Sequence, residues 1–281
     1  MDSFIYDHVF NRLERARWSL NDDIPWNEID KDLLKVHPET LQHIKVICLA
    51  EFTALDATMM FLRDFFEDID FSCFMSVWYY EEMKHHYVLK RYLAENGVEV
   101  HEHELKPIHQ YLPAGGLIPT ITMHLVGEIK LHCWYKAVSD FSPEGVAVKI
   151  FNYMAADELR HGQVYFEFLE RYIKRDPRQL EQVLRMARFM YKEEKGNVKH
   201  PVPQLVEGNA TFNFNDALTG VFDAWADQIK VANEKADKMT FRFLSKLSNY
   251  QINSQDDLNR AIKEVKRRNQ AVGAAAAAAQ A

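Results

Sequence analysis

The sequence predicts an all-α fold in which four helices form a bundle and further helices flank it. Two observations predict it: the motif Glu-x-x-His occurs twice, and a single glutamate in an apolar helical stretch precedes each copy. The two motifs are Glu82 with His85 and Glu158 with His161. Residues three apart in a helix lie on one face about one turn apart, so each motif presents a carboxylate and an imidazole together. Each pair is half of a metal site.

The two single glutamates are Glu51 and Glu128. The face of Glu51 at three- and four-residue steps is apolar: Ile44, Ile47, Cys48, Leu55 and Leu62. A carboxylate on such a stripe is costly to bury unless a cation or a proton neutralises it. Glu51 precedes Glu82 by 31 residues and Glu128 precedes Glu158 by 30, so the two halves match as a repeated helical hairpin would.

This set of residues predicts a ferritin-like four-helix bundle with a di-metal site. Such bundles take Glu-x-x-His from two helices and one Glu from each of the other two. Four carboxylates and two imidazoles suit two iron ions, or manganese as a second choice, whereas a site without thiolates is a poor fit to structural zinc. Four glutamates cancel the charge of two Fe²⁺ ions, so the reduced site carries no net charge in an apolar core.

The first half of the chain predicts three main helices. Residues 3–19 form an amphipathic helix, Pro38 opens a long helix to about Phe66 that carries Glu51, and residues 71–96 form the helix of Glu82. Residues 97–118 are rich in proline and glycine and are expected to connect the two hairpins. Three histidines there share no helical face, which favours solvated loop residues over metal ligands: His101, His103 and His109.

In the second half, residues 119–140 form the helix of Glu128, and Ser142 with Pro143 starts a helix to about Lys174. Asp176-Pro177 begins another, ending near Gly196. After a loop at 201–214, a helix over 216–246 has an apolar face interpreted as core packing: Leu218, Val221, Phe222, Trp225, Ile229, Ala232 and Ala236. Ser254 to Asp257 cap a short last helix. We expect residues 1–270 to form a single domain, followed by a low-complexity, Ala-rich tail at 271–281.

Composition limits the partners and the compartment. The chain has 281 residues, 47% of them hydrophobic, which is enough for one large core. With 41 acidic and 34 basic residues and no dense basic run, nucleic acid is not an expected partner. Three scattered cysteines favour a reducing cytoplasm. We expect no signal peptide and no transmembrane span, because the start lacks a basic and apolar run and no long uncharged apolar stretch occurs.

The stretches Glu81-Glu82-Met83-Lys84-His85 and Ala156-Asp157-Glu158-Leu159-Arg160-His161 resemble the soluble acyl-acyl-carrier-protein desaturases. Helices of that family carry Glu-Glu-x-Arg-His and Ala-Asp-Glu-Lys-Arg-His. Asp176-Pro177 and residues 201–208 are also similar, so the resemblance covers about residues 40–210. It implies that the ligands are Glu51, Glu82, His85, Glu128, Glu158 and His161. It also implies desaturation of an acyl thioester on acyl carrier protein, a ferredoxin-like electron donor and a homodimer.

The leading hypothesis is therefore an oxidoreductase in which a diferrous centre activates dioxygen and oxidises a carbon chain in an apolar cavity. Hydroxylation or N-oxygenation of a smaller substrate is the alternative. Some di-iron N-oxygenases have a histidine four residues before the last Glu, where this chain has Met154, which argues against that branch. Iron oxidation and storage, as in ferritins, is a third reading, disfavoured by the helices after residue 178.

Two acids beside the ligands are expected to support the histidines, because ligating histidines usually donate their other N–H to a carboxylate. Asp157 is placed to reach His85 across the bundle, and Glu81 to reach His161; the alternative is that both are helix-surface acids. Four cations near the carboxyl end form a candidate docking patch for an acidic carrier, or a solvated helix end: Lys263, Lys266, Arg267 and Arg268.

His132 marks a departure from the family. Desaturases have a threonine three residues after the Glu of the third helix, and this chain has Leu131 there. His124, Glu128 and His132 share one helical face. We expect His132 to be an extra iron ligand, a catalytic proton donor to bound oxygen, or a core histidine bonded to a carbonyl, since a neutral imidazole can serve any of the three.

Overall fold

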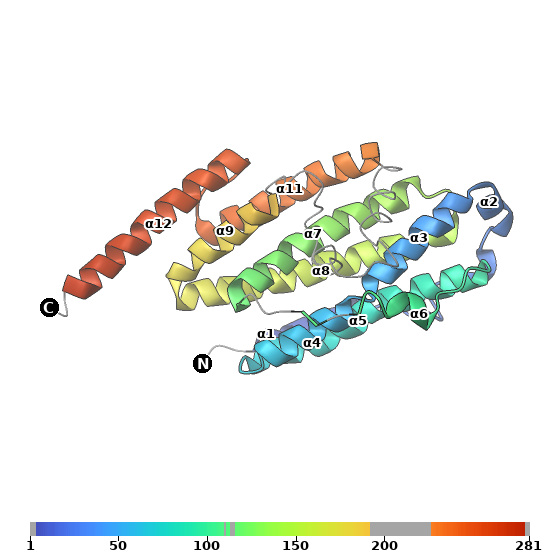
Figure 1. Cartoon of the computed structure of the whole chain (residues 1–281), viewed down its shortest axis with the longest axis horizontal. Helices are drawn as coiled ribbons and strands as arrows, with labels where there is room; N and C mark the ends of the chain where they lie inside the picture. Colours follow the sequence, from blue (N-terminus) through green and yellow to red (C-terminus); the bar gives the residue numbers. More distant parts are fainter. Residues whose placement is uncertain (1–3, 110, 113–115, 192–225, 279–281) are drawn as a thin grey trace.

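Helices dominate the part of the chain that the structure describes, and that part contains no strand (Figure 1). The computed structural model describes residues 4–109, 111–112, 116–191 and 226–278. The predicted all-α fold is confirmed. Among the described helices, none combines the length and the apolar character needed to cross a bilayer.

The bundle is built from two helical hairpins. Its segments are α3 (Pro38–Glu51) continued by α4 (Ala54–Asp64), α5 (Ile69–Glu95), α7 (Leu117–Phe141) and α8 (Gly145–Arg175). In one hairpin α3 and α4 pack along α5, and in the other α7 packs along α8 (Figure 1). Contacts between α5 and α8 join the hairpins, so both helices that carry Glu-x-x-His lie at the centre.

The apolar core consists of two clusters of buried residues. On α5, Phe71 to Trp78 belong to one cluster and Val88 to Leu93 to the other. On α8 the order is reversed, with residues 146–155 in the second cluster and 164–172 in the first. The Glu-x-x-His motifs of both helices lie between these stretches, so a polar layer separates two apolar ones.

The predicted helix from Pro38 to Phe66 is wrong, because it breaks directly after Glu51. At the break, the Thr53 N–H and hydroxyl donate to the Ala50 carbonyl over 3.0 and 2.8 Å, in place of the regular helical ladder. Because of the break, the apolar face after Glu51 is rotated relative to the one before it. Leu62, which was expected on the apolar stripe, is therefore 37% exposed. Phe61 is fully buried in its place.

The start of α8 also differs from the prediction. Glu144, and not Ser142, is the residue before the helix, and its carboxylate accepts from the N–H groups of Val146 and Ala147 over 3.0 and 2.8 Å. The same carboxylate accepts the Tyr92 hydroxyl over 2.8 Å. Glu144 is 1% exposed, so this single side chain ties α8 to α5 inside the core.

Further helices flank the bundle. They are α1 (Ile5–Ala16), η1 (Trp26–Glu28), α2 (Lys31–Val36), which the sequence did not predict, α6 (Glu102–Leu105), η2 (Pro177–Gln179), α9 (Leu180–Tyr191), α11 (Ala226–Ser248) and α12 (Gln255–Ala278). The helix α1 packs on α5, while α11 and α9 pack on α7. Ile229, Ala232 and Ala236 of α11 are buried, as predicted. The rest of that stripe, the Gly196 helix end and residues 201–214 lie outside the described residues.

The last helix is longer than predicted. It continues past Arg268 to Ala278, because alanine is the best helix former. Figure 1 shows α12 extending away from the bundle with the carboxyl terminus at its far end. Residues 271–274 are exposed, so this part of the tail adds length to α12 and no core. Whether residues 1–270 form a single domain stays a prediction.

Replacing Glu144 by alanine should lower the free energy of unfolding by about 1–3 kcal/mol, because two helix N–H groups and a buried hydroxyl lose their acceptor. Denaturant unfolding measures the change. The control is Asp30→Ala, which removes the exposed cap of the short α2 and should cost less. Equal effects of the two substitutions would contradict the role assigned to Glu144.

Candidate metal centre

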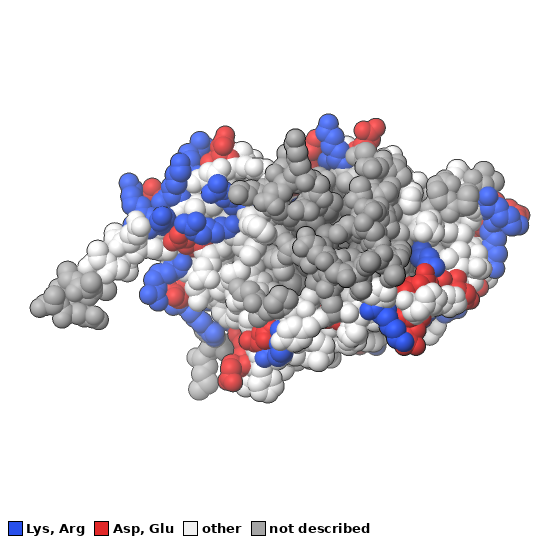
Figure 2. Space-filling view, viewed as in Figure 1, with Lys and Arg blue, Asp and Glu red and all other residues white. Residues whose placement is uncertain are grey.

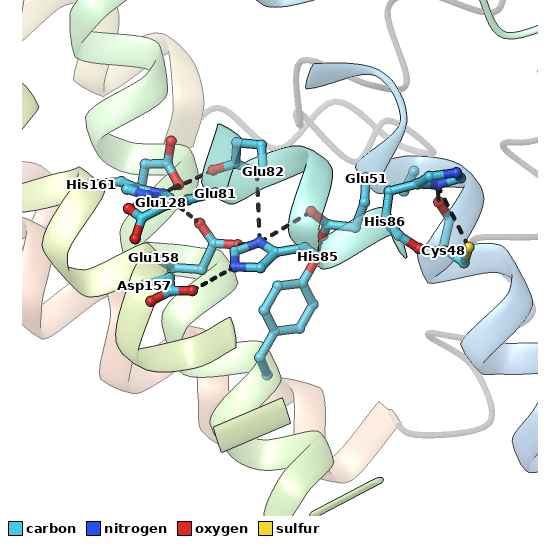
Figure 3. Close-up of polar contacts among 12 residues, drawn as sticks. Cys48, Glu51, Glu81, Glu82, His85, His86, Glu128, Asp157, Glu158 and His161 are labelled. Carbon is cyan, nitrogen blue, oxygen red and sulfur yellow. Dashed lines mark hydrogen bonds and ion pairs between the residues drawn. The ribbon is translucent and has the colours of Figure 1, made fainter. Parts of the chain in front are cut away.

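The structure brings the six predicted ligands together in two overlapping groups. The groups are Glu51, Glu82, His85 and Glu158, and Glu82, Glu128, Glu158 and His161. Within each group, one ligand atom from every residue lies within 4.8 Å of the others. Glu82 and Glu158 belong to both groups and so lie where a bridging carboxylate is needed. Figure 3 shows the six side chains converging from α3, α5, α7 and α8.

Each imidazole faces three carboxylates through its Nδ1 atom. The Nδ1 of His85 lies 3.5 Å from Glu51, 3.7 Å from Glu82 and 3.4 Å from Glu158. The Nδ1 of His161 lies 2.8 Å from Glu82, 3.5 Å from Glu158 and 3.9 Å from Glu128. An ion between each Nδ1 and its carboxylates would have four protein ligands, two of them shared with the second ion.

The other nitrogen of each imidazole donates to an acid outside the groups. The Nε2 of His85 lies 3.0 Å from Asp157, and the Nε2 of His161 lies 3.0 Å from Glu81. The structure thus contains both contacts that the sequence predicts. An ionised carboxylate only accepts hydrogen bonds, so both Nε2 atoms carry a proton, and Nδ1 is the atom of each ring that can bind a metal once it has lost its proton.

Unpaired buried atoms test whether the site fits a metal. Apart from contacts among the six ligands themselves, the buried atoms that lack a hydrogen-bond partner include Glu82 Oε1, His85 Nδ1, Glu128 Oε2, Glu158 Oε1, Glu158 Oε2 and His161 Nδ1. Each such atom costs about 1–3 kcal/mol if nothing satisfies it. Two cations would satisfy all of them at once. No cysteine belongs to either group, so this donor set fits iron or manganese better than structural zinc.

Burial also perturbs the protonation of the ligands. It raises the pKa of Glu51 to about 8, and burial together with the charge of Glu158 raises the pKa of Glu128 well above its usual range. Burial lowers the pKa of His85, but hydrogen bonds to Glu158 and Glu51 outweigh it and raise that pKa to about 10. Positive charge must therefore accompany these carboxylates into the core, as protons or as metal ions.

A cavity of about 80 Å³ adjoins the two groups. Its walls are Ala50, Glu51, Thr53, Ala54, Ala57, Trp78, Glu82, His124, Gly127, Glu128, Leu131 and Tyr135. Leu131 lies three residues after Glu128, so the wall beside Glu128 is apolar at that point. Burial lowers the pKa of His124 to about 4, and its Nδ1 lies 3.0 Å from the Thr120 carbonyl, so this imidazole is neutral.

The structure places His132 outside both groups and away from the cavity walls. Its Nδ1 lies 2.7 Å from the Ala155 carbonyl, which is the geometry of the carbonyl-bonded alternative. Proton delivery by His132 stays a prediction. The three histidines of the connection are also separate from the site: His101 and His103 are exposed, although His103 lies in α6 and not in a loop, and His109 contacts Asp56 at 2.5 Å.

Three aromatic donors around the site were not predicted. The Tyr135 hydroxyl donates to Glu51, the Trp78 Nε1 donates to Glu128 over 3.0 Å, and the Trp18 Nε1 donates to Asp157 over 2.7 Å. Tyr135 follows Glu128 by two helical turns and Trp78 precedes Glu82 by one, so both share a face with a ligand. That spacing was visible in the sequence, but aromatic residues at helical spacing more often pack in the apolar core than donate to a ligand.

A scan of the chain against models of known protein families finds no match, and a search of the curated proteins finds none either. The resemblance to the desaturases therefore rests on the sequence motifs.

Purified protein loaded with ferrous iron should hold close to two ions per chain, and Glu158→Ala or His161→Ala should lower that content severely because Glu158 serves both ions. Elemental analysis by mass spectrometry measures it. His109→Ala is the matched control, since it removes a histidine that contacts a carboxylate outside both groups. Full iron content in both ligand variants would eliminate the assigned site.

Proposed function

We propose that the protein is an oxidoreductase that uses two iron ions, or manganese as a second choice, to activate dioxygen. The observation that carries the proposal is the pair of four-residue groups that share Glu82 and Glu158. Bridged carboxylate sites of this composition hold two redox-active ions in helix bundles. The bound ions would supply the oxidation, while the protein supplies binding, orientation and electrostatics.

The residues around the ions have separable tasks. The hydrogen bonds from Nε2 of His85 and His161 to Asp157 and Glu81 fix the ring orientation and the tautomer of both ligands. Burial excludes water, which protects reactive species from side reactions. The apolar part of the cavity wall, which includes Leu131, would contact the carbon atoms of the substrate next to Glu128.

The substrate class follows from the motifs that resemble the desaturases. An acyl thioester on acyl carrier protein is the leading candidate, with a ferredoxin-like electron donor and a homodimer as further parts of the proposal. The docking patch predicted for an acidic carrier is exposed along α12: Lys263, Lys266, Arg267 and Arg268. Figure 2 shows Lys and Arg gathered at the end of the molecule where α9 and α12 lie. Complementary charge at such a patch would steer an acidic partner.

A second candidate is hydroxylation of a smaller substrate, and the size of the cavity favours it. A volume of about 80 Å³ is well below the roughly 300–1,000 Å³ of pockets that enclose drug-sized ligands. Leu131, at the position where the desaturases have threonine, also favours hydroxylation over desaturation. N-oxygenation is less favoured because of Met154, and iron storage because α9, α11 and α12 extend the chain beyond a ferritin bundle.

Measurements of oxygen uptake distinguish the desaturase, hydroxylase and iron-storage candidates. With ferrous iron bound and a ferredoxin-type reductant present, an acyl thioester on carrier protein should stimulate oxygen consumption and yield an oxidised acyl chain. Stimulation by small hydrophobic molecules alone would favour the hydroxylase candidate. The Glu158→Ala variant should show no stimulation, because it removes a ligand of both ions. Ferrous iron oxidation and mineral formation without any substrate dependence would contradict the oxidoreductase proposal.

A further inference from the structure

The two glutamates at the outer ends of the site each have one oxygen engaged by an aromatic donor. On Glu51, Oε1 accepts the Tyr135 hydroxyl, and Oε2 faces the Nδ1 of His85 at 3.5 Å. On Glu128, Oε1 accepts the Trp78 Nε1 over 3.0 Å, and Oε2 faces the Nδ1 of His161 at 3.9 Å. Each of these carboxylates therefore has one oxygen directed to an ion position and one held away from it.

The two glutamates that belong to both groups, Glu82 and Glu158, have different contacts. The contacts of Glu82 and Glu158 are with the Nδ1 atoms of the two ligand imidazoles, and no aromatic donor among the described residues binds either carboxylate. A bridging carboxylate needs both oxygens for metal, whereas a carboxylate at the end of the site needs only one. Glu51 and Glu128, which each belong to one group, thus accept a hydrogen bond from an aromatic donor. Within the described part of the chain, Glu82 and Glu158, which belong to both groups, do not.

Both donors come from helices that face the glutamate they contact. Tyr135 belongs to α7 and reaches Glu51 at the end of α3, while Trp78 belongs to α5 and reaches Glu128 on α7. Both are nearly fully buried, at 4% and 3% exposed. Together with Glu51 and Glu128 they form part of the cavity wall, so the two hydrogen bonds lie on the side of the ions where a small ligand would arrive.

We propose that Tyr135 and Trp78 are positioning residues that restrict Glu51 and Glu128 to binding metal through one oxygen each, so that each ion keeps a coordination position open toward the cavity. This inference rests on the proposed metal pair. A hydrogen bond to a charged acceptor favours the one-oxygen arrangement by about 10- to 100-fold. If the bond is absent, the freed oxygen can bind the same ion and occupy the open position.

Binding of azide to the oxidised di-iron protein tests the inference without turnover. Tyr135→Phe and Trp78→Phe should keep two irons per chain but bind azide about tenfold or more weakly, because the freed carboxylate oxygen competes for the position. Titration followed by the azide-to-iron charge-transfer absorption gives the affinity. Cobalt(II) loading adds a second readout, since visible cobalt(II) absorption weakens as the coordination number rises, and both variants should show weaker absorption than the unaltered protein.

Tyr92→Phe is the matched control. It removes another buried Tyr–Glu hydrogen bond, the one of 2.8 Å to Glu144, and should leave azide affinity and cobalt absorption unchanged. Unchanged azide affinity in both test variants would overturn the inference while leaving the metal pair intact. Loss of iron from the test variants would also overturn it, because the hydrogen bonds would then retain the ligands and not restrict them. If the unaltered protein failed to bind two irons, the proposed function itself would fall.

Discussion

The burial of four carboxylates and two imidazoles between two apolar clusters is the constraint on which the rest of this structure depends. Isolated buried charges are among the most costly features a core can contain, and the helices could not pack around them without compensation. Two divalent ions would cancel the four carboxylate charges and satisfy the unpaired atoms of Glu82, Glu128 and Glu158. The metal pair would thus stabilise the fold as well as carry the chemistry.

Charged side chains farther from the site compensate the buried acids that contact the ligand histidines. Asp157 and Glu81, which accept from the ligand histidines, are themselves buried acids. Arg160 forms an ion pair with Asp157, and Lys84 is buried with its ammonium 4.3 Å from the centre of the Trp18 ring. Basic side chains therefore surround the acids that orient the imidazoles. The cavity wall combines apolar residues such as Leu131 with the carboxylates of Glu51, Glu82 and Glu128.

Local patterns predicted most of the helices and the six Glu and His side chains that the structure brings together, because Glu-x-x-His spacing and helix-start residues such as Pro38 act within one or two turns of a single helix. Features that depend on how helices face one another were not predicted. The break after Glu51 carries no proline or glycine, and it arises where Thr53 bonds back to Ala50. The donors to Glu51 and Glu128 require the register between helices. The register between helices also decides that His124 lines the cavity and His132 does not.

The most direct test of a paired metal site is a crystal structure of the iron-loaded protein with anomalous data collected on both sides of the iron absorption edge. Two separate iron peaks are expected, one beside Glu51 and His85 and the other beside Glu128 and His161. Glu82 and Glu158 should contact both peaks. A single peak, or iron peaks outside these two groups, would contradict it.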